Sequence, residues 1–481
     1  MQKKFTIKKN TIKVIAKRNK KQIKDATSTS ITKKAVTSGL QVNIISAANI
    51  DASNYDRLET PIAAESRKRL ESGSAVKTRR RAVKDLTFKS APPVPTAPKD
   101  PKEIRKQWLI SQAKIHIGLI DVPLIIPVLL ISVFGLFAIY SATISYASNR
   151  YVLVQGMAMC IGLIMMLALS VIDYRSIAPH YKYIIYINVL ILILTLILGE
   201  GVTGETNKNW IRLGPVNIQP SEFAKLLFIF SFGVHLSRVR DKMHKFSTVF
   251  FLIIHALLIF GLVLLQGDIG ILTIFFIIFA SMSFSAGLSI WYYIAGIAAV
   301  ICVSPFLWAK LDQYQKDRIM LCFDPSIDPE GLNERYQQMW SQKAISNGGI
   351  TGTGFTKGIT TQHFDDPTSA KHTDMIYSTI CEEFGIIGAL LVLAVTCFII
   401  FRIMKIAIRC ENNAGRYICV GVATMFMIQV VENVGMCLGI MPVIGITYPF
   451  LSYGGSSILS CLLAIGMVLS VSSHREQSFF S

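Results

Sequence analysis

Long apolar runs recur between residues 118 and 473, and they leave little room for any fold other than a bundle of membrane-spanning helices. A helix needs roughly 20 mostly apolar residues to cross a bilayer. Charged residues make up only 16% of the chain, well below the roughly 25% of soluble domains. The sequence therefore predicts an all-α polytopic membrane protein with about ten transmembrane helices. Their expected ranges are 120–141, 151–172, 182–199, 220–237, 246–265, 269–287, 289–309, 375–402, 416–439 and 453–472.

Positive charge is concentrated at the start of the chain. Residues 1–120 hold 27 Lys and Arg against 9 Asp and Glu, a net charge of +18, whereas the whole chain carries +19. Segments rich in Lys, Arg, Ser and Thr bury too little apolar surface to fold. We therefore predict a mostly disordered, basic cytoplasmic tail over 1–117, attracted to anionic lipid by about 1 kcal/mol per basic residue near the surface. Binding to a protein or to nucleic acid is the alternative, and we expect no nucleic-acid partner.

Basic residues in the loops orient the predicted spans, because cytoplasmic loops are enriched in Lys and Arg. With ten spans, the tail, RVRDKMHK at 238–245 and FRIMKIAIRCENNAGR at 401–416 all fall on one side. This places the N-terminus and a short tail, 474–481, in the cytoplasm. The 310–374 segment then becomes a large extracellular loop between the seventh and eighth helices of the membrane domain, 118–473. Its scattered aromatic, Gly and Pro residues favour an ordered lid or re-entrant segment over a disordered loop.

The stretch PTSAKHTDMIYSTICEEFG, 367–385, carries three carboxylates at and below the edge of an apolar span. If a helix begins near Asp374, Glu382 lies about 12 Å deeper, and steps of about 100° keep the three acids, including Glu383, off one face. An acid in mid-bilayer costs about 2.5–3.5 kcal/mol, so it should face protein or water. We expect Glu382 and Glu383 to hydrogen-bond neighbouring helices. For Asp374, a functional role at the membrane–water boundary competes with that of a plain N-terminal helix aspartate.

The stretch NWIRLGPVNIQPSEFAK, 209–225, combines aromatic and basic residues beside a predicted span. A proline at the first turn is typical of a helix start. Glu222 and Lys225 are three residues apart and hence neighbours on one helical face. They are either a neutralised structural pair or a means of presenting a cation to a phosphate. With the interfacial Trp210 and with Arg212, whose side chain type suits phosphate, the pattern suits a pyrophosphate-bearing lipid.

Three further polar residues stand out, and several chemistries are excluded. Asp268 lies in a very short turn, LLQGDIG, where a plain turn residue is the simplest interpretation. Glu432 and Asn433 lie inside the ninth predicted span. The aromatic and glycine residues of YPFLSYGGSS, 448–457, suit either an interfacial belt or close helix packing. A nucleotide-binding loop is absent, so we expect no nucleotide, and the nine cysteines show no zinc spacing.

Six short motifs occur in the order found in the SEDS family of bacteria (shape, elongation, division and sporulation proteins, typified by RodA, FtsW and SpoVE). The chain resembles this family over about 118–473. The motifs are YSAT at 140–143, NWIRLG…IQPSEFAK at 209–225, QGDIG at 266–270, FDPSIDPEG…SNGGITGTG at 323–354, KHTDMIYSTICEEFG at 371–385 and ENVGMCLGIMPVIGITYPFLSYGGSS at 432–457.

The resemblance implies a peptidoglycan glycosyltransferase that joins lipid II units into β-1,4 glycan strands with inversion and releases undecaprenyl pyrophosphate. It implies that Asp374 is the general base, that Lys225 and Arg212 stabilise the leaving diphosphate, and that Glu222 orients Lys225. A divalent cation, Mg²⁺ or Mn²⁺, is an optional addition with Asp374 as its one candidate ligand. The expected partner is a class B penicillin-binding protein. Further substrate contacts are expected from Lys208, Trp210, Gln219, Ser221, Asp268, His372, Thr373, Ser452, Tyr453 and Gly454.

The chain departs from the family pattern at several positions. Asn209 stands where the family usually has Arg, so Lys208 or Arg212 would have to replace that contact, and QGD stands for the usual QPD. TSAK stands before the HTD motif, where Pro or Glu is usual, and PVIGITYPF leans toward the elongation type typified by RodA. The alternative function is a lipid II flippase of the same fold, and a third is an O-antigen-ligase-like or scaffold protein.

Overall fold

A computed structural model of the chain describes residues 121–146, 149–201, 208–213, 216–311, 313–329, 335–363 and 370–474. These residues all belong to one compact unit, Pro101–Ser481. The predicted basic tail and all but the first residue of the predicted C-terminal tail lie outside the described residues.

Each of the ten predicted spans corresponds to one long helix. Eight helices of the described residues are long and apolar enough to cross a membrane. The other two are α11, which carries Glu222, Lys225 and His235 among its apolar residues, and α13, which has only 17 residues. An all-α multi-pass membrane protein is thus confirmed. The helices are α7 (Val122–Thr143), α8 (Arg150–Val171), α10 (Tyr181–Leu198), α11 (Pro220–Val239), α12 (Phe246–Leu265), α13 (Ile269–Ser285), α14 (Ile290–Lys310), α18 (Ile376–Arg409), α19 (Asn413–Leu438) and α20 (Gly455–Ser473).

Short elements connect the long helices. One was not predicted: an antiparallel hairpin between α10 and α11, whose strands pair Ile211 with Ile218. The long segment between α14 and α18, which we expect to be ordered, contains three short α-helices and two 3-10 helices among its described residues. The connecting elements are η2 (Ile144–Tyr146), α9 (Tyr174–Ile177), η3 (Ala178–His180), β1 (Ile211–Leu213), β2 (Val216–Ile218), η4 (Arg240–Lys242), α15 (Gln313–Met320), η5 (Pro325–Ile327), α16 (Tyr336–Gly348), α17 (Ile359–His363) and η6 (Ala370–His372).

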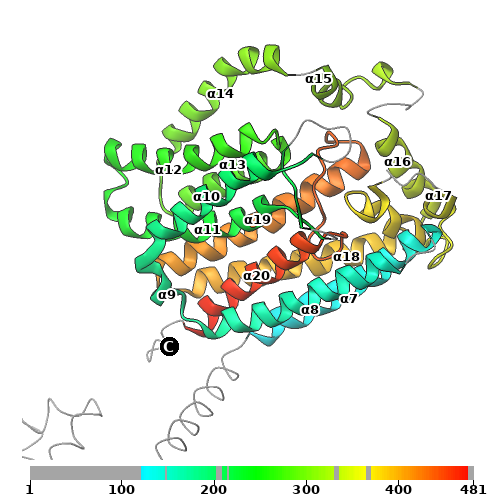
Figure 1. Cartoon of the computed structure of the whole chain (residues 1–481), viewed down its shortest axis with the longest axis horizontal. Helices are drawn as coiled ribbons and strands as arrows, with labels where there is room; N and C mark the ends of the chain where they lie inside the picture. Colours follow the sequence, from blue (N-terminus) through cyan, green and yellow to red (C-terminus); the bar gives the residue numbers. More distant parts are fainter. Residues whose placement is uncertain are drawn as a thin grey trace, which may run out of the picture. The chain divides into compact units, whose positions relative to one another are not determined.

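The connections gather at two ends of the bundle. At the end that carries the hairpin, called here the hairpin end, Asn209 bonds Asp268 and η6 packs against the α7–α8 connection. At the opposite end, Arg240 bonds Asn413 across the α11–α12 and α18–α19 connections. Figure 1 shows α16 and α17 at one end of the bundle and α9 at the other. Most of the sequence-predicted site residues lie on connections of the hairpin end.

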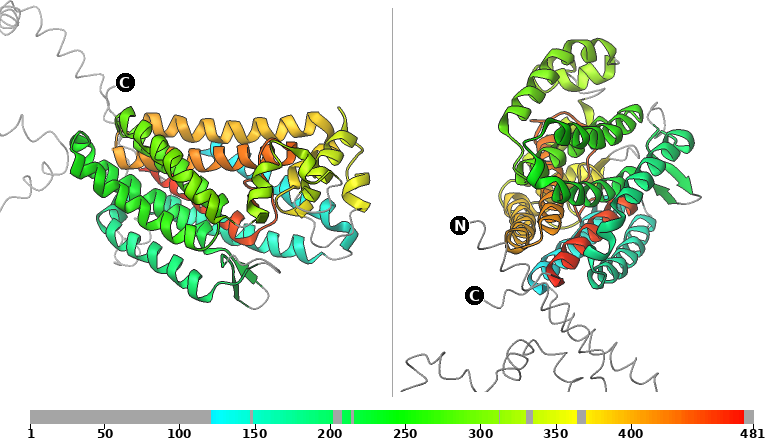
Figure 2. Two further views of the ribbon diagram at one scale, coloured as in Figure 1. Left: turned by 90° about the horizontal axis from the view of Figure 1, so that it is seen from above. Right: turned by 90° about the vertical axis from the view of Figure 1, so that its left-hand side faces the viewer.

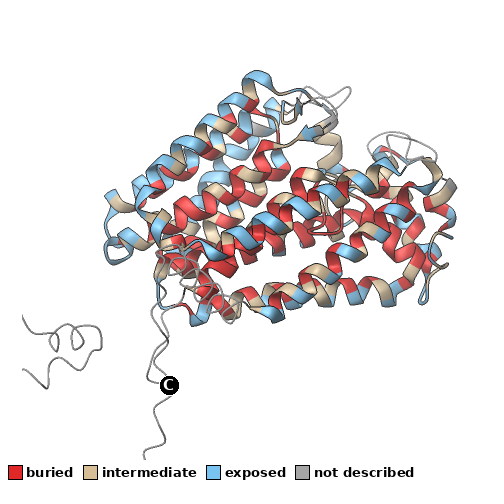
Figure 3. Ribbon diagram, turned by 60° about the horizontal axis from the view of Figure 1, so that its bottom comes forward, coloured by how far each residue is buried: buried red, intermediate tan, exposed pale blue. Residues whose placement is uncertain are grey.

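The bundle is built around α19 and α20. In their apolar stretches 78% and 83% of the residues are buried, against 22% in α8. Helix α19 packs against α11, α13 and α18, while α20 packs along α8. Figure 3 shows buried residues on the inward sides of the helices and exposed ones outside. Helix α14 has no buried residue in its apolar stretch, and Figure 2 shows it standing apart from the other long helices.

Helix α18 is broken at Gly385, where the backbone has φ 64° and ψ −168°. The break frees the amides of Ile386 and Ile387, which donate to the carbonyls of Gly349 (3.0 Å) and Ile350 (3.3 Å). The amides of Thr353 and Gly354 donate to the carbonyls of Glu382 and Glu383, which precede the break. The segment between α14 and α18 is called here the outer segment, because the loop charges predict that it is extracellular. Its residues 349–354 dock on α18 through these backbone hydrogen bonds, well beyond the start of the helix.

Candidate functional site

Asp374 lies immediately before α18 and is half-buried. The Asn433 side-chain amide of α19 donates to the Asp374 carbonyl (2.7 Å) and to the Ile446 carbonyl (2.7 Å). Gly445, which has φ +71°, lies beside the carboxylate, because a Cβ there would be 3.5 Å from Asp374 Oδ2. The predicted base is thus at a helix entry, with its backbone fixed by α19 and its carboxylate against a glycine.

His372 is buried among aromatic rings next to Asp374. Its ring centroid lies 4.9 Å from that of Tyr151, 5.5 Å from Tyr453 and 5.9 Å from Tyr146. The Tyr453 amide donates to the His372 carbonyl (2.9 Å). Burial, helped by the positive charge of Lys371, lowers the pKa of His372 to about 4. The imidazole is therefore neutral at neutral pH and supplies no positive charge to a phosphate.

Glu222 and Lys225 form the ion pair that their spacing predicts. Lys225 Nζ lies 2.8 Å from Glu222 Oε1, and both side chains are buried. The Ser460 hydroxyl of α20 donates to the other carboxylate oxygen (2.7 Å). Ser221 is also buried, and its hydroxyl has no hydrogen-bond partner among the described residues. Lys225 is thus a neutralised cation inside the bundle.

Asp268 begins α13 and connects it to the hairpin. Its Oδ1 accepts from the Ile271 amide (3.0 Å), while its Oδ2 accepts from Asn209 (3.1 Å) and Gln219 (3.2 Å). Burial raises the pKa of Asp268, while the Ile271 amide, Asn209 and the charge of Lys225 oppose the rise. Asn209, which replaces the usual Arg, therefore has a definite contact in this chain: it is a neutral donor to a buried carboxyl group.

Three other predicted site residues near the hairpin, Arg212, Trp210 and Lys208, are more exposed than Asp268. Arg212 is exposed and pairs with Glu200 (Nε to Oε2, 3.2 Å). Trp210 exchanges two backbone hydrogen bonds with Glu200 and is half-buried. Lys208 is exposed, and its amide donates to the Gln266 carbonyl. The structure therefore separates the candidate cations into a buried, paired Lys225 and two that face outward.

The candidate site has two halves, one around Asp374 and one around Asp268. The connection between α19 and α20 contacts both. Gly445 lies beside Asp374, and the Ile444 carbonyl would be 3.0 Å from a Cβ on Gly270 of α13. At the entry to α20, Ser456 accepts from the amide of Gln219 (3.0 Å). This single segment therefore contacts both the Asp374 side and the Asp268 side of the hairpin end.

The candidates at the entry to α20 are fixed by a residue that sequence reasoning missed. The Gln155 side chain of α8 donates to the Ser452 carbonyl (3.1 Å) and accepts from the Gly454 amide (3.0 Å). The Ser452 hydroxyl accepts from the Tyr448 amide (2.7 Å). Gln155, Gly445 and Ser456 were not predicted. Gly445 and Ser456 lie within a quoted motif, whereas Gln155 is one polar residue in an apolar run and gives little signal alone.

Glu432 lies beside Asn433 on α19, within range of the positive charge of Lys225. It is buried, and its Oε2 has no hydrogen-bond partner among the described residues. Because its neighbour Asn433 holds Asp374, adjacent residues of α19 face the two halves of the site.

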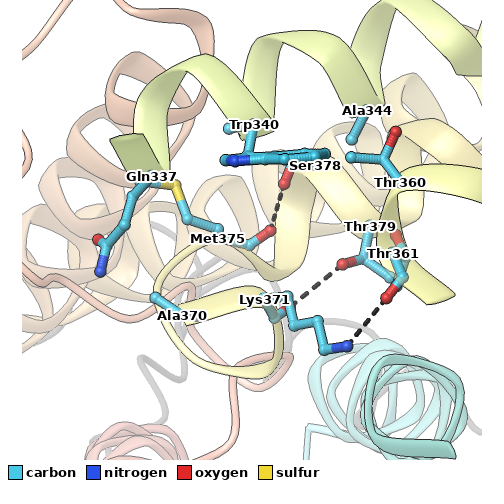
Figure 4. A pocket seen from close by; sticks show the side chains of 11 residues that line it. Gln337, Trp340, Ala344, Thr360, Thr361, Ala370, Lys371, Met375, Ser378 and Thr379 are labelled. Carbon is cyan, nitrogen blue, oxygen red and sulfur yellow. Dashed lines mark hydrogen bonds between the residues drawn. The ribbon is translucent and has the colours of Figure 1, made fainter. Parts of the chain in front are cut away.

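A small pocket lies next to the Asp374 segment (Figure 4). Helices α16 and α17, η6 and the start of α18 form its walls. Neither Asp374 nor Lys225 lines it. Its lining residues are Gln337, Trp340, Ser341, Ala344, Thr360, Thr361, Ala370, Lys371, Met375, Ser378 and Thr379.

A divalent cation finds no ready-made site in the described part of the chain. No three His, Cys, Asp or Glu residues come close enough there to hold a metal ion together. Asp374 alone would supply one ligand, whereas protein-bound divalent cations usually take several oxygen ligands. We therefore derive no step through a metal.

The fold and site define a multi-pass helical membrane protein with a polar site at one end of the bundle. The profile of the FtsW/RodA/SpoVE family, described as cell cycle proteins, matches residues 122–477. The chain belongs to this family.

Relatives and solved structures agree with that assignment. A probable peptidoglycan glycosyltransferase FtsW from Geobacter metallireducens is 30% identical over 364 residues, which cover 74% of this chain and 95% of the relative. Stage V sporulation protein E from Bacillus subtilis is 32% identical, covering 74% and 98%. A chain from a peptidoglycan synthase complex that coordinates polymerization and crosslinking has a TM-score of 0.63 at 28% identity and covers 75% of this chain and 99% of its own. RodA from Thermus thermophilus shares the fold, with a TM-score of 0.55 at 24% identity over 75% and 98%.

Proposed function

We propose that this protein is a peptidoglycan polymerase that joins lipid II units into β-1,4 glycan strands. The observation that carries the proposal is the position of Asp374 in a chain of this family. The carboxylate is half-buried at a helix entry, between the aromatic cluster around His372 and the connection that leads to α20. The FtsW relatives carry the name of peptidoglycan glycosyltransferases, which supports the reaction class.

Asp374 acts as the general base in this proposal. The 4-hydroxyl oxygen of the acceptor GlcNAc attacks C1 of the donor MurNAc while its proton passes to the Asp374 carboxylate. The bond from C1 to the diphosphate oxygen breaks, and undecaprenyl pyrophosphate leaves with that electron pair. Attack opposite the leaving group inverts C1 and gives the β-1,4 bond. A carboxylate shielded partly from water suits this task, because partial desolvation brings its basicity closer to neutral pH.

The leaving diphosphate needs positive charge, and we assign the first contact to the exposed Arg212 and Lys208. Each can reach a phosphate without breaking a buried pair, and a guanidinium matches phosphate geometry. Lys225 remains paired with Glu222 (2.8 Å), and uncoupling that pair inside the bundle would cost several kcal/mol. We therefore give Lys225 a role in fixing the start of α11 behind the site, with Gln219 and Asp268 beside it.

The setting of the reaction follows from the orientation predicted by loop charge. The N-terminus lies in the cytoplasm, and the hairpin end faces outward from a bacterial plasma membrane. Lipid II then reaches the site from the outer leaflet. A class B penicillin-binding protein is the proposed partner, and the structurally similar chain from a peptidoglycan synthase complex supports it. The preference for an elongation role over division or sporulation stays a prediction.

A lipid II flippase is the alternative function. A flippase needs polar groups along its transport path, and the buried acids Glu382, Glu383 and Glu432 are the candidates. Glu382 instead bonds the outer segment through Thr360 and Thr361, and Glu383 accepts from Ser141 of α7. These bonds hold α17 and α7 in place, which favours a structural role for Glu382 and Glu383 over a transport path. Glu432, whose Oε2 has no hydrogen-bond partner among the described residues, is the acid that a flippase would use. The names of the FtsW relatives favour polymerisation.

One reconstitution separates the two functions. Purified protein in proteoliposomes, with and without a class B penicillin-binding protein, receives fluorescent lipid II, and both glycan polymer and lipid translocation are measured. We expect polymer and no accelerated translocation. Translocation without polymer would support the flippase instead. A parallel reaction with a divalent chelator tests whether a cation is needed.

A further inference from the structure

Lys371 is a buried lysine that the proposed reaction does not use. Its side chain is 7% exposed. Nζ donates to the Thr361 carbonyl of α17 (2.9 Å) and to the Ser145 hydroxyl of η2 (2.9 Å), and it lies 4.6 Å from the Tyr146 ring centroid. Figure 4 shows the side chain extending from η6 toward Thr361. A charged group at this depth is retained only where its partners are well placed.

The backbone of Lys371 is fixed as well. Its carbonyl accepts from the Thr379 hydroxyl on α18 (3.1 Å). The next turn is closed by the amides of Thr373 and Met375, which both donate to the Ala370 carbonyl. Asp374 lies inside this turn, three residues after Lys371. Movement of Lys371 would therefore move the backbone that carries the proposed base.

Glu382 fixes Thr361 of α17, the residue whose carbonyl accepts from Lys371. This fully buried carboxylate accepts from the Thr360 amide (2.7 Å), the Thr361 amide (2.8 Å) and the Thr361 hydroxyl (2.5 Å). Hydrogen bonds to a charged acceptor are about twice as strong as neutral ones. Glu382 thus holds α17, and the Thr361 carbonyl of α17 holds Lys371.

We propose that Lys371 is a positioning residue for Asp374, and that Glu382 acts on Asp374 through Thr361 and Lys371. The kinetic test of this inference rests on the proposed function, whereas the hydrogen-exchange test does not. It also explains the unusual TSAK before the HTD motif: its lysine ties the turn that carries Asp374 to α17. A direct role of Lys371 with the diphosphate is less well supported, because its ammonium group is buried and already bonded.

The effect of losing Lys371 follows from geometry. Lys371→Met keeps the apolar stem but removes the ammonium group, which leaves the Thr361 carbonyl and the Ser145 hydroxyl without this partner. A misplacement of about 1 Å can cost about 100-fold in rate. We therefore expect kcat to fall about 10- to 100-fold with KM unchanged within twofold, since substrate contacts are not removed.

The experiment measures steady-state lipid II polymerisation by the full-length protein with its penicillin-binding partner. Lys371→Arg keeps hydrogen-bond donors at this position, so its kcat should be at least threefold higher than that of Lys371→Met. The matched control is Lys357→Met, an exposed lysine of the same outer segment, and it should keep kcat within twofold. Glu382→Gln should lower kcat in the same sense. The Lys371→Met/Glu382→Gln double variant should be no slower than the slower single variant, because both act along one path.

Hydrogen exchange gives a readout that does not depend on the reaction. Amides of Thr373 and Met375 should exchange faster in Lys371→Met, while amides of α18 beyond Gly385 keep the wild-type rate. Wild-type kcat and exchange in Lys371→Met would overturn the inference, as would a rise in KM at unchanged kcat. If the wild-type protein forms no polymer, the proposed function fails, and the exchange rates still decide the positioning role. Should Lys371→Met fail to fold, Lys371→Arg and Glu382→Gln carry the same comparison.

Discussion

At the residue scale, charged groups at the hairpin end include buried ones with fixed partners, such as Lys225 and Asp268, and exposed ones, such as Arg212. Asp374 is intermediate, because its backbone is held by Asn433 while its side chain is half-buried. Spacing alone predicted the Glu222–Lys225 pair. It could not predict that Asn209 and Gln219 meet at Asp268, since Asp268 lies 59 and 49 residues away from them along the chain, a separation that only the folded bundle closes.

The buried pair gives a stability prediction. Glu222→Gln leaves Lys225 charged and fully buried, so we expect a loss of about 3–5 kcal/mol in the free energy of unfolding. Glu222→Gln/Lys225→Met should recover much of it, because no buried charge is then stranded. Thermal unfolding in detergent measures both. The exposed Arg212–Glu200 pair is the control, and Arg212→Gln should change stability little. A double variant less stable than Glu222→Gln would contradict this account.

His372 gives a pH prediction. Burial lowers the pKa of His372 to about 4 in the folded protein, against 6.5 for an ordinary histidine in the unfolded chain. Between these two pH values the unfolded chain binds a proton that the folded protein does not. Stability from this group is complete above pH 6.5 and is lost as the pH falls toward 4. The free energy of unfolding that is lost in this way is about 3 kcal/mol. In His372→Phe, which keeps an aromatic ring, the midpoint of thermal unfolding should fall less between pH 6.5 and 4. Equal pH dependence in the two proteins would contradict the assignment.

At the element scale, the break in α18 joins the outer segment to the bundle. Sequence analysis predicted a span over 375–402 and expected Glu382 and Glu383 to bond neighbouring helices. Glu383 does bond Ser141 of α7, whereas Glu382 bonds α17 of the outer segment. The periodicity gave no sign of the break, because a single glycine in an apolar run is compatible with a continuous helix. The hairpin was missed for a similar reason, since strands of three residues leave almost no alternating pattern.

Gly385 gives the prediction for this element. Its φ of 64° disfavours any side chain, and a Cβ there would clash with the Ile350 carbonyl. Gly385→Ala should undock the 349–354 segment and speed hydrogen exchange at the amides of Ile386 and Ile387. Gly261→Ala in α12 is the control, because a Cβ there meets nothing within 4 Å. Unchanged exchange at Ile386 in Gly385→Ala would mean that the docking does not depend on the break.

At the scale of the whole molecule, apolar composition and basic loops were enough to predict the ten spans and the class of protein. They could not predict which helices form the centre. Helices α19 and α20 are mostly buried and α14 is not, although all three are apolar segments of similar length. The difference depends in part on polar groups such as Asn433 and Gln155, whose partners lie on the connection between α19 and α20.

Both the order of the sequence motifs and the three-dimensional structure are needed to describe the candidate site. Motif order placed Asp374, Lys225 and Arg212 together as a catalytic group, and the structure separates them by environment. Asp374 is half-buried, Lys225 is buried and paired, and Arg212 is exposed. The local sequence around each residue does not determine these environments, because each one depends on contacts from distant segments.

The central claim is that the Asp374 carboxylate takes the proton of the attacking sugar hydroxyl. The most direct measurement compares lipid II polymerisation by the wild-type protein with that of Asp374→Asn, which keeps the shape of the side chain but is not basic. Asp324→Asn, an exposed aspartate of the same outer segment, is the control. We predict that Asp374→Asn loses at least 100-fold in rate, within the range typical of a lost general base, while Asp324→Asn polymerises normally. Polymerisation by Asp374→Asn at the wild-type rate would contradict the claim.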